Sequence, residues 1–532
     1  MHEDILDKGV KASLLCQVYY VKYYEELTME IDNSPFSFGL PHEHWRPYQN
    51  EVISWLSRTR KGVYILEAPT GFGKSAVAAA ISTIRDTTVI TISTDLQIQY
   101  AEAYGFSLVW GRARYPCTNP DRVKRWVDRY GEQYNQHSVR EPTVDRCPLP
   151  TTDRCPSCPY HQARKNAQRN SRLVLNLHYA ALSRWWRERP CLFLDEAHRA
   201  ADTLSSLLSF HFSHRTRQRF SLPPWPQAQG HAVWAHRAVA AWLGHSSSLL
   251  QAQLRSIPDS DEKMRHYLKR LSVRFSKLSS SLGSCPPGSY YISIRNNELH
   301  ISPVDVSTAI QPLLRPLTVL MSATIGDPGQ LARELGLSSF QFRSIPHPFP
   351  PEIRPVFFYT QSAPLGHRSQ EQEWRHNASI ITHILNQHPA EKGIIHVASW
   401  KQVQTLARFL PSERLFIPQP PRSRAVRQFR QSPQPLVALS PSWREGLDFP
   451  NDQARFSIIA KIPFADLSDP ITRLRKERYG WPWYLWKAAL GVVQAAGRIV
   501  RSEDDYGTSY ITDGHWTRVR SYAPQWFTVQ DI

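Results

Sequence analysis

The stretch that decides the fold is an eight-residue loop, Ala68-Pro69-Thr70-Gly71-Phe72-Gly73-Lys74-Ser75. It follows an apolar run at residues 63–66 and precedes a segment that favours a helix from Lys74. In this strand-loop-helix context, backbone N–H groups and a helix N-terminus hold phosphates. The first position is alanine where the general pattern has glycine, but the Gly-Lys-Ser core is intact. We therefore expect a phosphate loop, with Lys74 at the β and γ phosphates and Ser75 as a magnesium ligand.

A pair of carboxylates follows a second apolar strand. Residues 191–194 are apolar, and Asp195-Glu196-Ala197-His198 comes directly after them. This order places Asp195 and Glu196 at the carboxyl edge of a sheet, where ligands bind in parallel α/β folds. We expect Asp195 to hold magnesium, directly or through water, and Glu196 to orient and deprotonate the attacking water. An acidic helix cap is the alternative that the residues alone leave open.

A third motif lies near the end of the chain, in Gln494-Ala495-Ala496-Gly497-Arg498-Ile499-Val500-Arg501. Two arginines three residues apart would share one face of a helix. Arg498 and Arg501 could then act as arginine fingers across a cleft between two domains. A solvated basic helix face is the alternative.

Two interruptions break an otherwise alternating strand-helix pattern. The cysteine insertion, residues 104–172, is rich in Pro, Arg and Cys. The helical insertion, residues 202–287, has Leu-rich helical spacing at 269–282 and precedes an expected hairpin, 290–294 with 298–302, turned at Asn296-Asn297. A second strand-helix set follows the Pro-rich link 346–355, with strands expected at 393–397, 436–439 and 456–460. The pattern predicts two parallel-sheet domains, the first of which carries both insertions.

Four of the seven cysteines lie in the cysteine insertion, at Cys117, Cys147, Cys155 and Cys158. So few cysteines in 532 residues do not make a disulfide scaffold, which favours a reducing compartment and thiolate ligands. Four thiolates suit an iron-sulfur cluster or a structural zinc, and the spacing of 29, 7 and 2 intervening residues leaves both open.

The charge of the chain favours a polyanionic partner. Lys and Arg number 64 against 46 Asp and Glu, for a formal net charge of +18. A basic run beside aromatic residues at 473–486, together with basic residues around Trp110 and Trp126, could bind and stack single-stranded nucleic acid. Aromatic core with a basic rim is the alternative. We expect no membrane span, because no apolar run approaches about 18 residues, and a cytoplasmic, nucleoid-associated protein.

The motifs together resemble a known family. Asp195 to His198, Ser322-Ala323-Thr324 and Gln494 to Arg501 stand in the order of the helicase motifs of superfamily two, and the chain resembles its XPD/DinG branch, of bacterial or phage DinG type. The resemblance spans about residues 45–516. Its further matches are Arg46-Pro47-Tyr48-Gln49, residues 93–99, 176–179, 346–350 and 443–449, and Lys461-Ile462-Pro463-Phe464 with Asp469-Pro470.

The resemblance implies an α/β fold of two RecA-like domains with an iron-sulfur insertion and a helical arch. The implied division is a lead-in at 1–44, a first motor domain at 45–103, 173–201 and 288–345, the cluster insertion at 104–172, the arch at 202–287 and a second motor domain at 346–532. It also implies a 4Fe-4S cluster on the four cysteines, since this family places its cluster ligands between the phosphate loop and the Asp-Glu-Ala-His box.

The implied activity is that of an ATP- and magnesium-dependent helicase on single-stranded and forked DNA, moving 5' to 3'. Besides residues 68–75, the ATP contacts would include Arg46, Gln49, Gly446 and Asp448. His198, Ser322, Ala323 and Thr324 would couple ATP hydrolysis to the second domain, with Gln494 in the catalytic set. Repair, replication or defence proteins are possible partners. The alternatives are an ATP-gated scaffold that does not unwind, and an RNA helicase.

Overall fold

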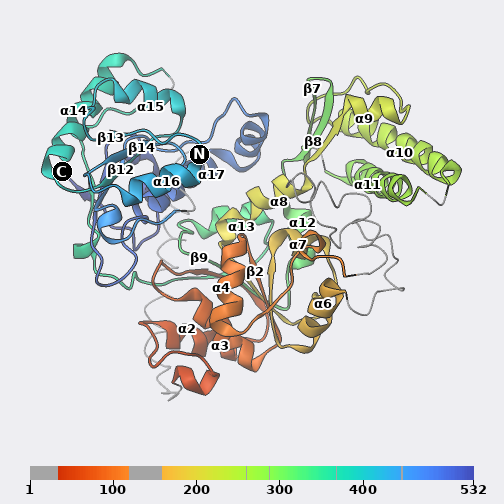
Figure 1. Ribbon diagram of the computed structural model, residues 1–532, viewed down its shortest axis with the longest axis horizontal. Helices are drawn as coiled ribbons and strands as arrows, with labels where there is room; N and C mark the ends of the chain where they lie inside the picture. Colours follow the sequence, from red (N-terminus) through yellow and green to blue (C-terminus); the bar gives the residue numbers. More distant parts are fainter. Residues whose placement is uncertain (1–33, 119–157, 259–260, 287, 367, 445–446) are drawn as a thin grey trace, which may run out of the picture.

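The computed structural model describes residues 34–118, 158–258, 261–286, 288–366, 368–444 and 447–532 (Figure 1). Cys147, Cys155 and Gly446, like most of the lead-in, therefore lie outside the described residues. The rest of the chain forms two sheet domains and a projecting helical unit (Figure 1).

A wholly parallel sheet forms the centre of the first domain, in the order β10-β1-β9-β5-β2-β4-β3. Most of its strands are buried apolar runs, as a sheet covered on both faces requires. The bounds are β1 Gly62–Glu67, β2 Thr87–Thr91, β3 Ser107–Leu108, β4 Arg172–Asn176, β5 Cys191–Asp195, β9 Leu317–Ser322 and β10 Gln341–Ser344.

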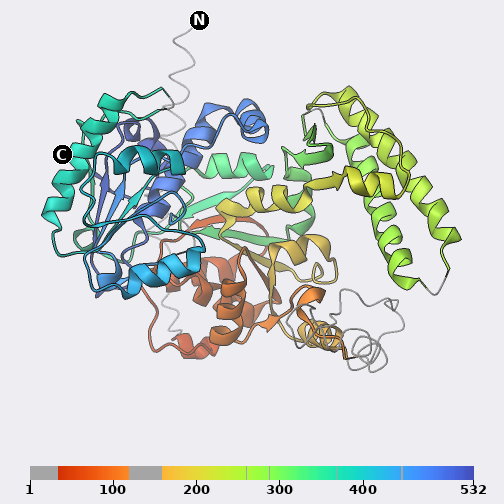
Figure 2. The same cartoon turned by 45° about the horizontal axis from the view of Figure 1, so that its top comes forward.

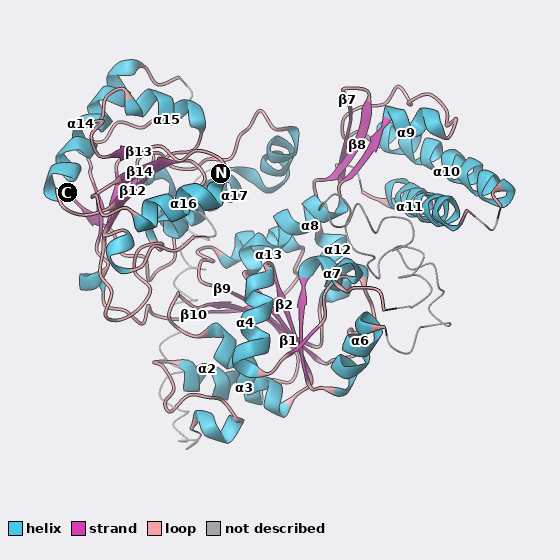
Figure 3. Cartoon of the chain, viewed as in Figure 1, coloured by secondary structure: helices cyan, strands magenta, loops and turns pink. Residues whose placement is uncertain are grey.

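Helices cover both faces of this sheet (Figure 3). The alanine-rich helix α3 packs closely against it because residues 78–80 are fully buried and have side chains of a single carbon. The helices of this domain are α2 Gln49–Arg58, α3 Lys74–Ile84, α4 Thr94–Tyr104, α6 Pro159–Arg169, α7 Leu177–Leu182, α8 Ala200–Leu208, α12 Ser307–Ile310 and α13 Pro328–Leu335.

The helical insertion stands away from both sheet domains (Figure 2). Two long antiparallel helices, α10 Val233–Ser256 and α11 Glu262–Ser284, pack against the antiparallel sheet β6-β8-β7. The remaining elements are β6 Phe210–Ser213, α9 His214–Arg219, β7 Tyr290–Arg295 and β8 Glu298–Pro303. The expected hairpin is present, and Asn296 and Asn297 take the positive φ values, 49° and 60°, that a tight two-residue turn needs.

The limits of the helical insertion differ from the expected 202–287. The hairpin pairs with β6, His211 lying opposite His300, so it belongs to the insertion and not to the first domain. At the other end, α8 buries Ala200, Ala201 and Leu204 in the core of the first domain. The insertion therefore runs from about residue 210 to about residue 303.

The second domain contains another wholly parallel sheet, in the order β13-β14-β12-β15-β16-β11-β17. Its strands are β11 Val356–Phe358, β12 Gly393–His396, β13 Leu415–Phe416, β14 Val437–Ser440, β15 Phe456–Ile459, β16 Thr508–Ile511 and β17 Gln530–Asp531. Its helices are α14 Glu371–Gln387, α15 Trp400–Ala407, α16 Arg422–Gln431, α17 Pro470–Ala496 and α18 Trp516–Val519. The expected class, two parallel-sheet α/β domains, is confirmed.

Helix α17 joins the two domains. Trp483, Trp486 and Leu490 pack in a core of the first domain, whereas Val492 and Val493 pack in a core of the second. A kink at Gly480, whose φ is 84°, precedes Pro482 and interrupts the helix. Among the helices of the described residues, none has the length and apolar character needed to cross a membrane.

Candidate nucleotide site and domain interface

The phosphate loop connects β1 to α3 and has the backbone expected of it. Gly71 and Gly73 adopt φ values of 89° and 82°, which L-residues rarely take. The Lys74 ammonium donates to the carbonyl oxygen of Ala68 at 3.1 Å, which folds the lysine side chain back over the loop. The backbone amides of this loop and Lys74 could contact phosphates.

Arg46, before α2, and Gln49, the first residue of α2, support this loop. The Gln49 amide donates to the carbonyl oxygens of Phe72 at 2.6 Å and Gly73 at 3.2 Å, and the Arg46 guanidinium donates to that of Gly71. A Cβ on Gly73 would lie 2.4 Å from Gln49 Nε2, so this approach requires glycine. The structure therefore brings both predicted residues to the phosphate loop.

The carboxylates of the Asp-Glu-Ala-His box lie at the carboxyl end of β5, which is separated by β9 from β1, the strand that precedes the loop. Asp195 is buried, and its Oδ2 accepts from the Tyr100 hydroxyl at 3.1 Å, which also interacts with Ser75. Burial and the neighbouring Glu196 raise the pKa of Asp195 to about 6, and the Lys74 ammonium opposes the rise. A magnesium ion between Ser75 and Asp195 would remove this penalty, so the donor set fits the ion.

Among the described residues, no group of three or more His, Cys, Asp or Glu side chains forms a further metal site. Asp195 and Ser75, which the sequence predicts as magnesium ligands, therefore remain the candidate metal site.

His198 connects the box to the other motifs. Its Nδ1 lies 2.7 Å from Ser322 Oγ and 3.4 Å from the Glu196 carboxylate, while its Nε2 lies 2.5 Å from the Gln494 amide. Gln494 belongs to α17, so this chain of contacts runs from the first domain into the second. Thr324, the last residue of Ser322-Ala323-Thr324, lies 3.5 Å from Gln494. These predicted coupling residues meet at the domain interface, and Gln494 contacts His198 rather than the phosphate loop.

The two arginines differ from the expectation. Helix α17 ends at Ala496 and Gly497 caps it, so Arg498 and Arg501 do not share a helical face. Arg501 crosses to the first domain and donates to Thr70 Oγ1 at 3.3 Å. Arg498 instead bonds within its own domain, to the carbonyl oxygens of Arg444 at 2.9 Å and Leu447 at 3.0 Å. The expectation of a shared helical face is therefore wrong, whereas the role of both arginines as fingers stays a prediction.

Asp448 holds both of these arginines. Its Oδ1 accepts from Arg498 at 3.2 Å and also from Arg501. It therefore helps to orient Arg501 toward the loop, and the ATP contact that the resemblance implies for Asp448 stays a prediction.

The ends of the cysteine insertion meet at a packed neck. Tyr115 and Tyr160 lie 5.7 Å apart between ring centroids, each two residues from Cys117 or Cys158. Both cysteines are buried, at 9% and 8% exposed. The first and last predicted ligands thus each lie two residues from this ring contact, and the other two, Cys147 and Cys155, lie outside the described residues.

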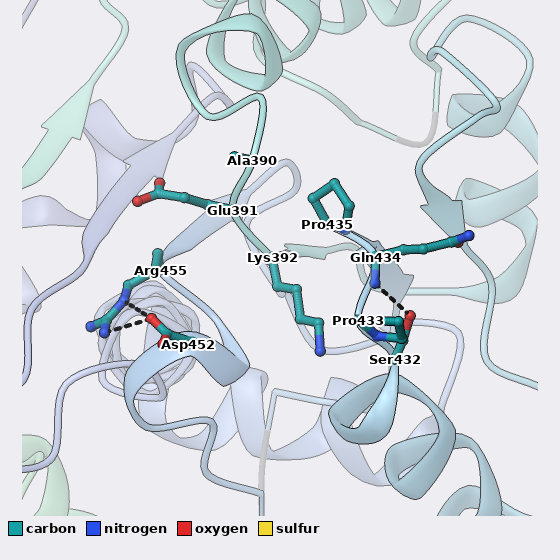
Figure 4. Close-up of a pocket in the computed structure, with 9 residues that line it drawn as sticks. All are labelled: Ala390, Glu391, Lys392, Ser432, Pro433, Gln434, Pro435, Asp452 and Arg455. Atoms are coloured by element: carbon teal, nitrogen blue, oxygen red, sulfur yellow. Dashed lines mark hydrogen bonds and ion pairs between the residues drawn. The ribbon is translucent and has the colours of Figure 1, made fainter.

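A pocket of about 280 Å³ lies on the second domain, but at the other edge of its sheet (Figure 4). Its walls come from the segments before β12, β14 and β15, at their amino ends. Lys392 and Arg455 line it with Glu391 and Asp452, so its charges are mixed. We assign it no role in nucleotide binding, because ligands in parallel sheets bind at the carboxyl ends of the strands.

Two residues of the site were missed in the sequence. Tyr100 lies within α4 and carries no motif, so only the fold reveals its contact with Asp195. Glu67 ends an apolar strand directly before the phosphate loop, the same pattern that made Asp195 visible. A carboxylate directly after an apolar strand is therefore the sequence signal that could have identified Glu67 as a site residue.

Part of the second domain matches a known protein family. Residues 381–530 match the family model described as Helicase C-terminal domain. The chain is 32% identical over 99 residues to the Regulator of telomere elongation helicase 1 homolog of Oryza sativa subsp. japonica, and 36% identical over 92 residues to that of Culex quinquefasciatus. Each match covers 15% of this chain, and 10% and 9% of the relative respectively, so the chain matches about a tenth of those proteins' length.

Solved structures give a longer match. The structure titled XPD_Helicase has a TM-score of 0.55 and 14% identity, and covers 91% of this chain and 98% of its own. The Structure of S. tokodaii Xpd4 has a TM-score of 0.55 and 13% identity, and covers 92% and 100%.

The fold and the site define a two-domain α/β protein with a candidate nucleotide site where its two parallel-sheet domains meet. Its fold is similar to that of the solved XPD helicases, and residues 381–530 match the model of helicase C-terminal domains. The resemblance drawn from the motifs is confirmed at this level.

Proposed function

We propose that the protein is an ATP-dependent DNA helicase that moves along single-stranded DNA, 5' to 3', and unwinds duplex or forked DNA. One observation carries this proposal: Arg501 of the second domain lies 3.3 Å from Thr70 in the phosphate loop of the first. A nucleotide bound at this loop would contact both domains, so its hydrolysis would change how the domains hold each other.

The residues of the site suggest how hydrolysis would proceed. Lys74 and the loop amides would bind the phosphates, and magnesium at Ser75 and Asp195 would neutralise their charge. Glu196, 3.4 Å from His198, would orient and deprotonate the attacking water. Arg501 would stabilise the charge that develops on the transferred phosphoryl group.

A candidate contact for the DNA strand lies at the kink of α17. Of the aromatic side chains that follow Gly480, Trp483, Tyr484 and Trp486 are buried, whereas Trp481 is 50% exposed. The Lys476 ammonium lies 4.4 Å from the Trp481 ring centroid. An exposed ring beside a cation suits base stacking and phosphate attraction on a single strand.

We also propose that Cys117, Cys147, Cys155 and Cys158 hold a 4Fe-4S cluster. The buried neck at Tyr115 and Tyr160 supports this. The cluster would supply a structural anchor for the insertion. Anaerobically purified protein should be brown and contain about four iron atoms per chain; colourless protein with one zinc would contradict the proposal.

The test of the motor is ATP hydrolysis stimulated by nucleic acid. Single-stranded DNA should raise turnover in the wild type, Lys74→Ala should abolish it, and the exposed Lys61→Ala should not change it. If DNA does not raise turnover, or Lys74→Ala hydrolyses ATP equally well, the proposal is wrong.

Two further measurements on the same protein distinguish the helicase proposal from its two alternatives. An ATP-gated scaffold would hydrolyse ATP but leave forked duplexes of both polarities intact. An RNA helicase would respond to single-stranded RNA more strongly than to DNA.

A further inference from the structure

Glu67 is a buried carboxylate that the proposed hydrolysis does not use. It is the last residue of β1, directly before the phosphate loop, and is 1% exposed. Its Oε1 accepts from the backbone amides of Ile325 and Gly326, both at 2.7 Å, and its Oε2 accepts from the Ser344 hydroxyl at 2.8 Å. Burial of a carboxylate is costly unless hydrogen bonds replace the lost water. The three hydrogen bonds to Glu67 offset this cost and fix the position of its carboxylate.

The two residues that Glu67 holds also contact the second domain. The indole N–H of Trp486 in α17 donates to the carbonyl oxygen of Ile325 at 2.6 Å. Gly326, whose φ is 64°, lies so close to the Tyr522 carbonyl oxygen that a Cβ would be 2.1 Å from it. Residues 325 and 326 are therefore held from one side by the strand of the phosphate loop and from the other by the second domain.

This contact is separate from the one through His198. The His198 contacts begin at the Asp-Glu-Ala-His box and pass through Ser322 to Gln494. The Glu67 contacts begin at the phosphate loop and pass through residues 325–326 to Trp486. The backbone also links Ala68 to Ser322, because the Ala68 N–H donates to the Ser322 carbonyl oxygen at 2.8 Å.

We infer that Glu67 is a positioning residue that couples the phosphate loop to the second domain through the backbone of residues 325–326. A shift of the loop on nucleotide binding moves the Glu67 carboxylate. Both amides follow, because they share one carboxylate oxygen, and the contacts with Trp486 and Tyr522 pass the displacement to the second domain. The inference rests on the proposed ATPase and adds a residue to it.

Two substitutions of equal length separate coupling from packing. Glu67→Met keeps the size of the side chain but removes both acceptors. Glu67→Gln keeps a carbonyl oxygen for the two amides, and its NH₂ group can donate to Ser344. We expect Glu67→Met to lower the single-strand-stimulated kcat at least tenfold while the Kd for the ATP analogue AMP-PNP stays within threefold, and Glu67→Gln to stay within threefold in both.

Ser344→Ala is the matched control, because it removes a partner of Glu67 but leaves both amides held. It should behave as the wild type. Trp486→Phe removes the indole donor from the other side of the same segment and should reproduce the kcat loss of Glu67→Met. If Glu67→Met does not fold, the kcat of Trp486→Phe tests the coupling role instead. Equal kcat in Glu67→Met and the wild type, or a Kd that changes as much as kcat, would overturn the inference.

Hydrogen exchange separates this inference from the proposed function, because it needs no nucleic acid. AMP-PNP should protect amides of residues 483–496 in the wild type and in Glu67→Gln, and protect them less than half as much in Glu67→Met. If AMP-PNP protects residues 483–496 of the wild type but single-stranded DNA does not stimulate its ATP hydrolysis, only the helicase proposal is overturned. A wild type whose residues 483–496 do not respond to AMP-PNP would overturn the coupling role.

Discussion

Substitution of Lys487 by methionine should weaken the contact between the two domains. The Lys487 ammonium, on α17, lies 3.1 Å from the Glu334 carboxylate of α13 and 3.2 Å from that of Asp202. The Glu334 side chain is 2% exposed, whereas that of Asp202 is 58% exposed. Because water screens the Asp202 pair, most of the effect should come from Glu334.

The expected magnitude follows from the burial of Glu334. Removal of one partner from a buried ion pair costs about 3–5 kcal/mol, since the remaining charge loses its compensation. At roughly 2–4 °C per kcal/mol for a domain of this size, a loss of about 3 kcal/mol lowers the midpoint of thermal unfolding by roughly 6–12 °C. The methylene groups of methionine replace those of lysine, so lost packing contributes little.

The loss should depend on pH, and its sign follows from the same carboxyl group. Burial raises the pKa of Glu334 above its ordinary 4.5, and Lys487 and Arg475 oppose the rise. Without Lys487 the pKa rises further, and the native state then binds a proton that the unfolded state does not. Stability of the variant therefore falls as the pH increases through that range, and the deficit relative to the wild type shrinks as the pH is lowered, by up to about 1.4 kcal/mol per unit.

Urea unfolding at pH 8 and pH 5.5, followed by tryptophan fluorescence, measures both effects. Trp483 donates to the Glu334 carboxylate at 3.0 Å, so a tryptophan reports directly from the contact. Lys401→Met, on the exposed side of α15, is the control and should stay within about 0.5 kcal/mol of the wild type. Equal stability of Lys487→Met and the wild type at pH 8, or a deficit that is no smaller at pH 5.5, would refute the reasoning.

Three further predictions concern binding. Gly73→Ala should weaken AMP-PNP binding at least tenfold in calorimetry, because its Cβ would meet the Gln49 amide at 2.4 Å; unchanged affinity would show that Gln49 yields. Trp481→Ala should weaken the binding of fluorescent single-stranded DNA by about five- to 160-fold, from a stacking contribution of about 1–3 kcal/mol. The same affinity in anisotropy would remove Trp481 from the strand path. Cys158→Ser should lose most of its iron while Cys285→Ser keeps it, and equal iron in both proteins would exclude Cys158 as a ligand.

The sequence predicts those parts of the candidate site that come directly after a strand in the chain. A buried strand followed directly by Gly71 to Ser75, or by Asp195 and Glu196, fixes both the element and the edge at which its chemistry lies. In a parallel sheet these edges coincide. The position of the candidate nucleotide site in the sheet therefore follows from local pattern.

The parts that could not be predicted depend on pairings across the chain. The hairpin of β7 and β8 is local, but its attachment to β6 pairs His211 with His300, and no nearby residue specifies that register. Similarly, Pro482 indicates a kink, yet only packing decides that Trp483 is buried and Trp481 exposed. The helix end was predictable, because Gly497 follows the last helical residue, as a capping glycine does.

The position of Lys487 suggests how one helix serves both domains during hydrolysis. Lys487 and Gln494 lie seven residues apart on α17, which at 1.5 Å per residue is about 10 Å. If the buried charges hold α17 at Lys487, a rotation of about 10° about that point moves Gln494 by about 2 Å, enough to break its 2.5 Å contact with His198. Because a break at Lys487 would instead leave Glu334 buried without its partner, the lower-energy motion pivots there. We therefore expect nucleotide binding to open and close the contacts of Gln494 and Arg501, while the charged contact of Lys487 remains intact.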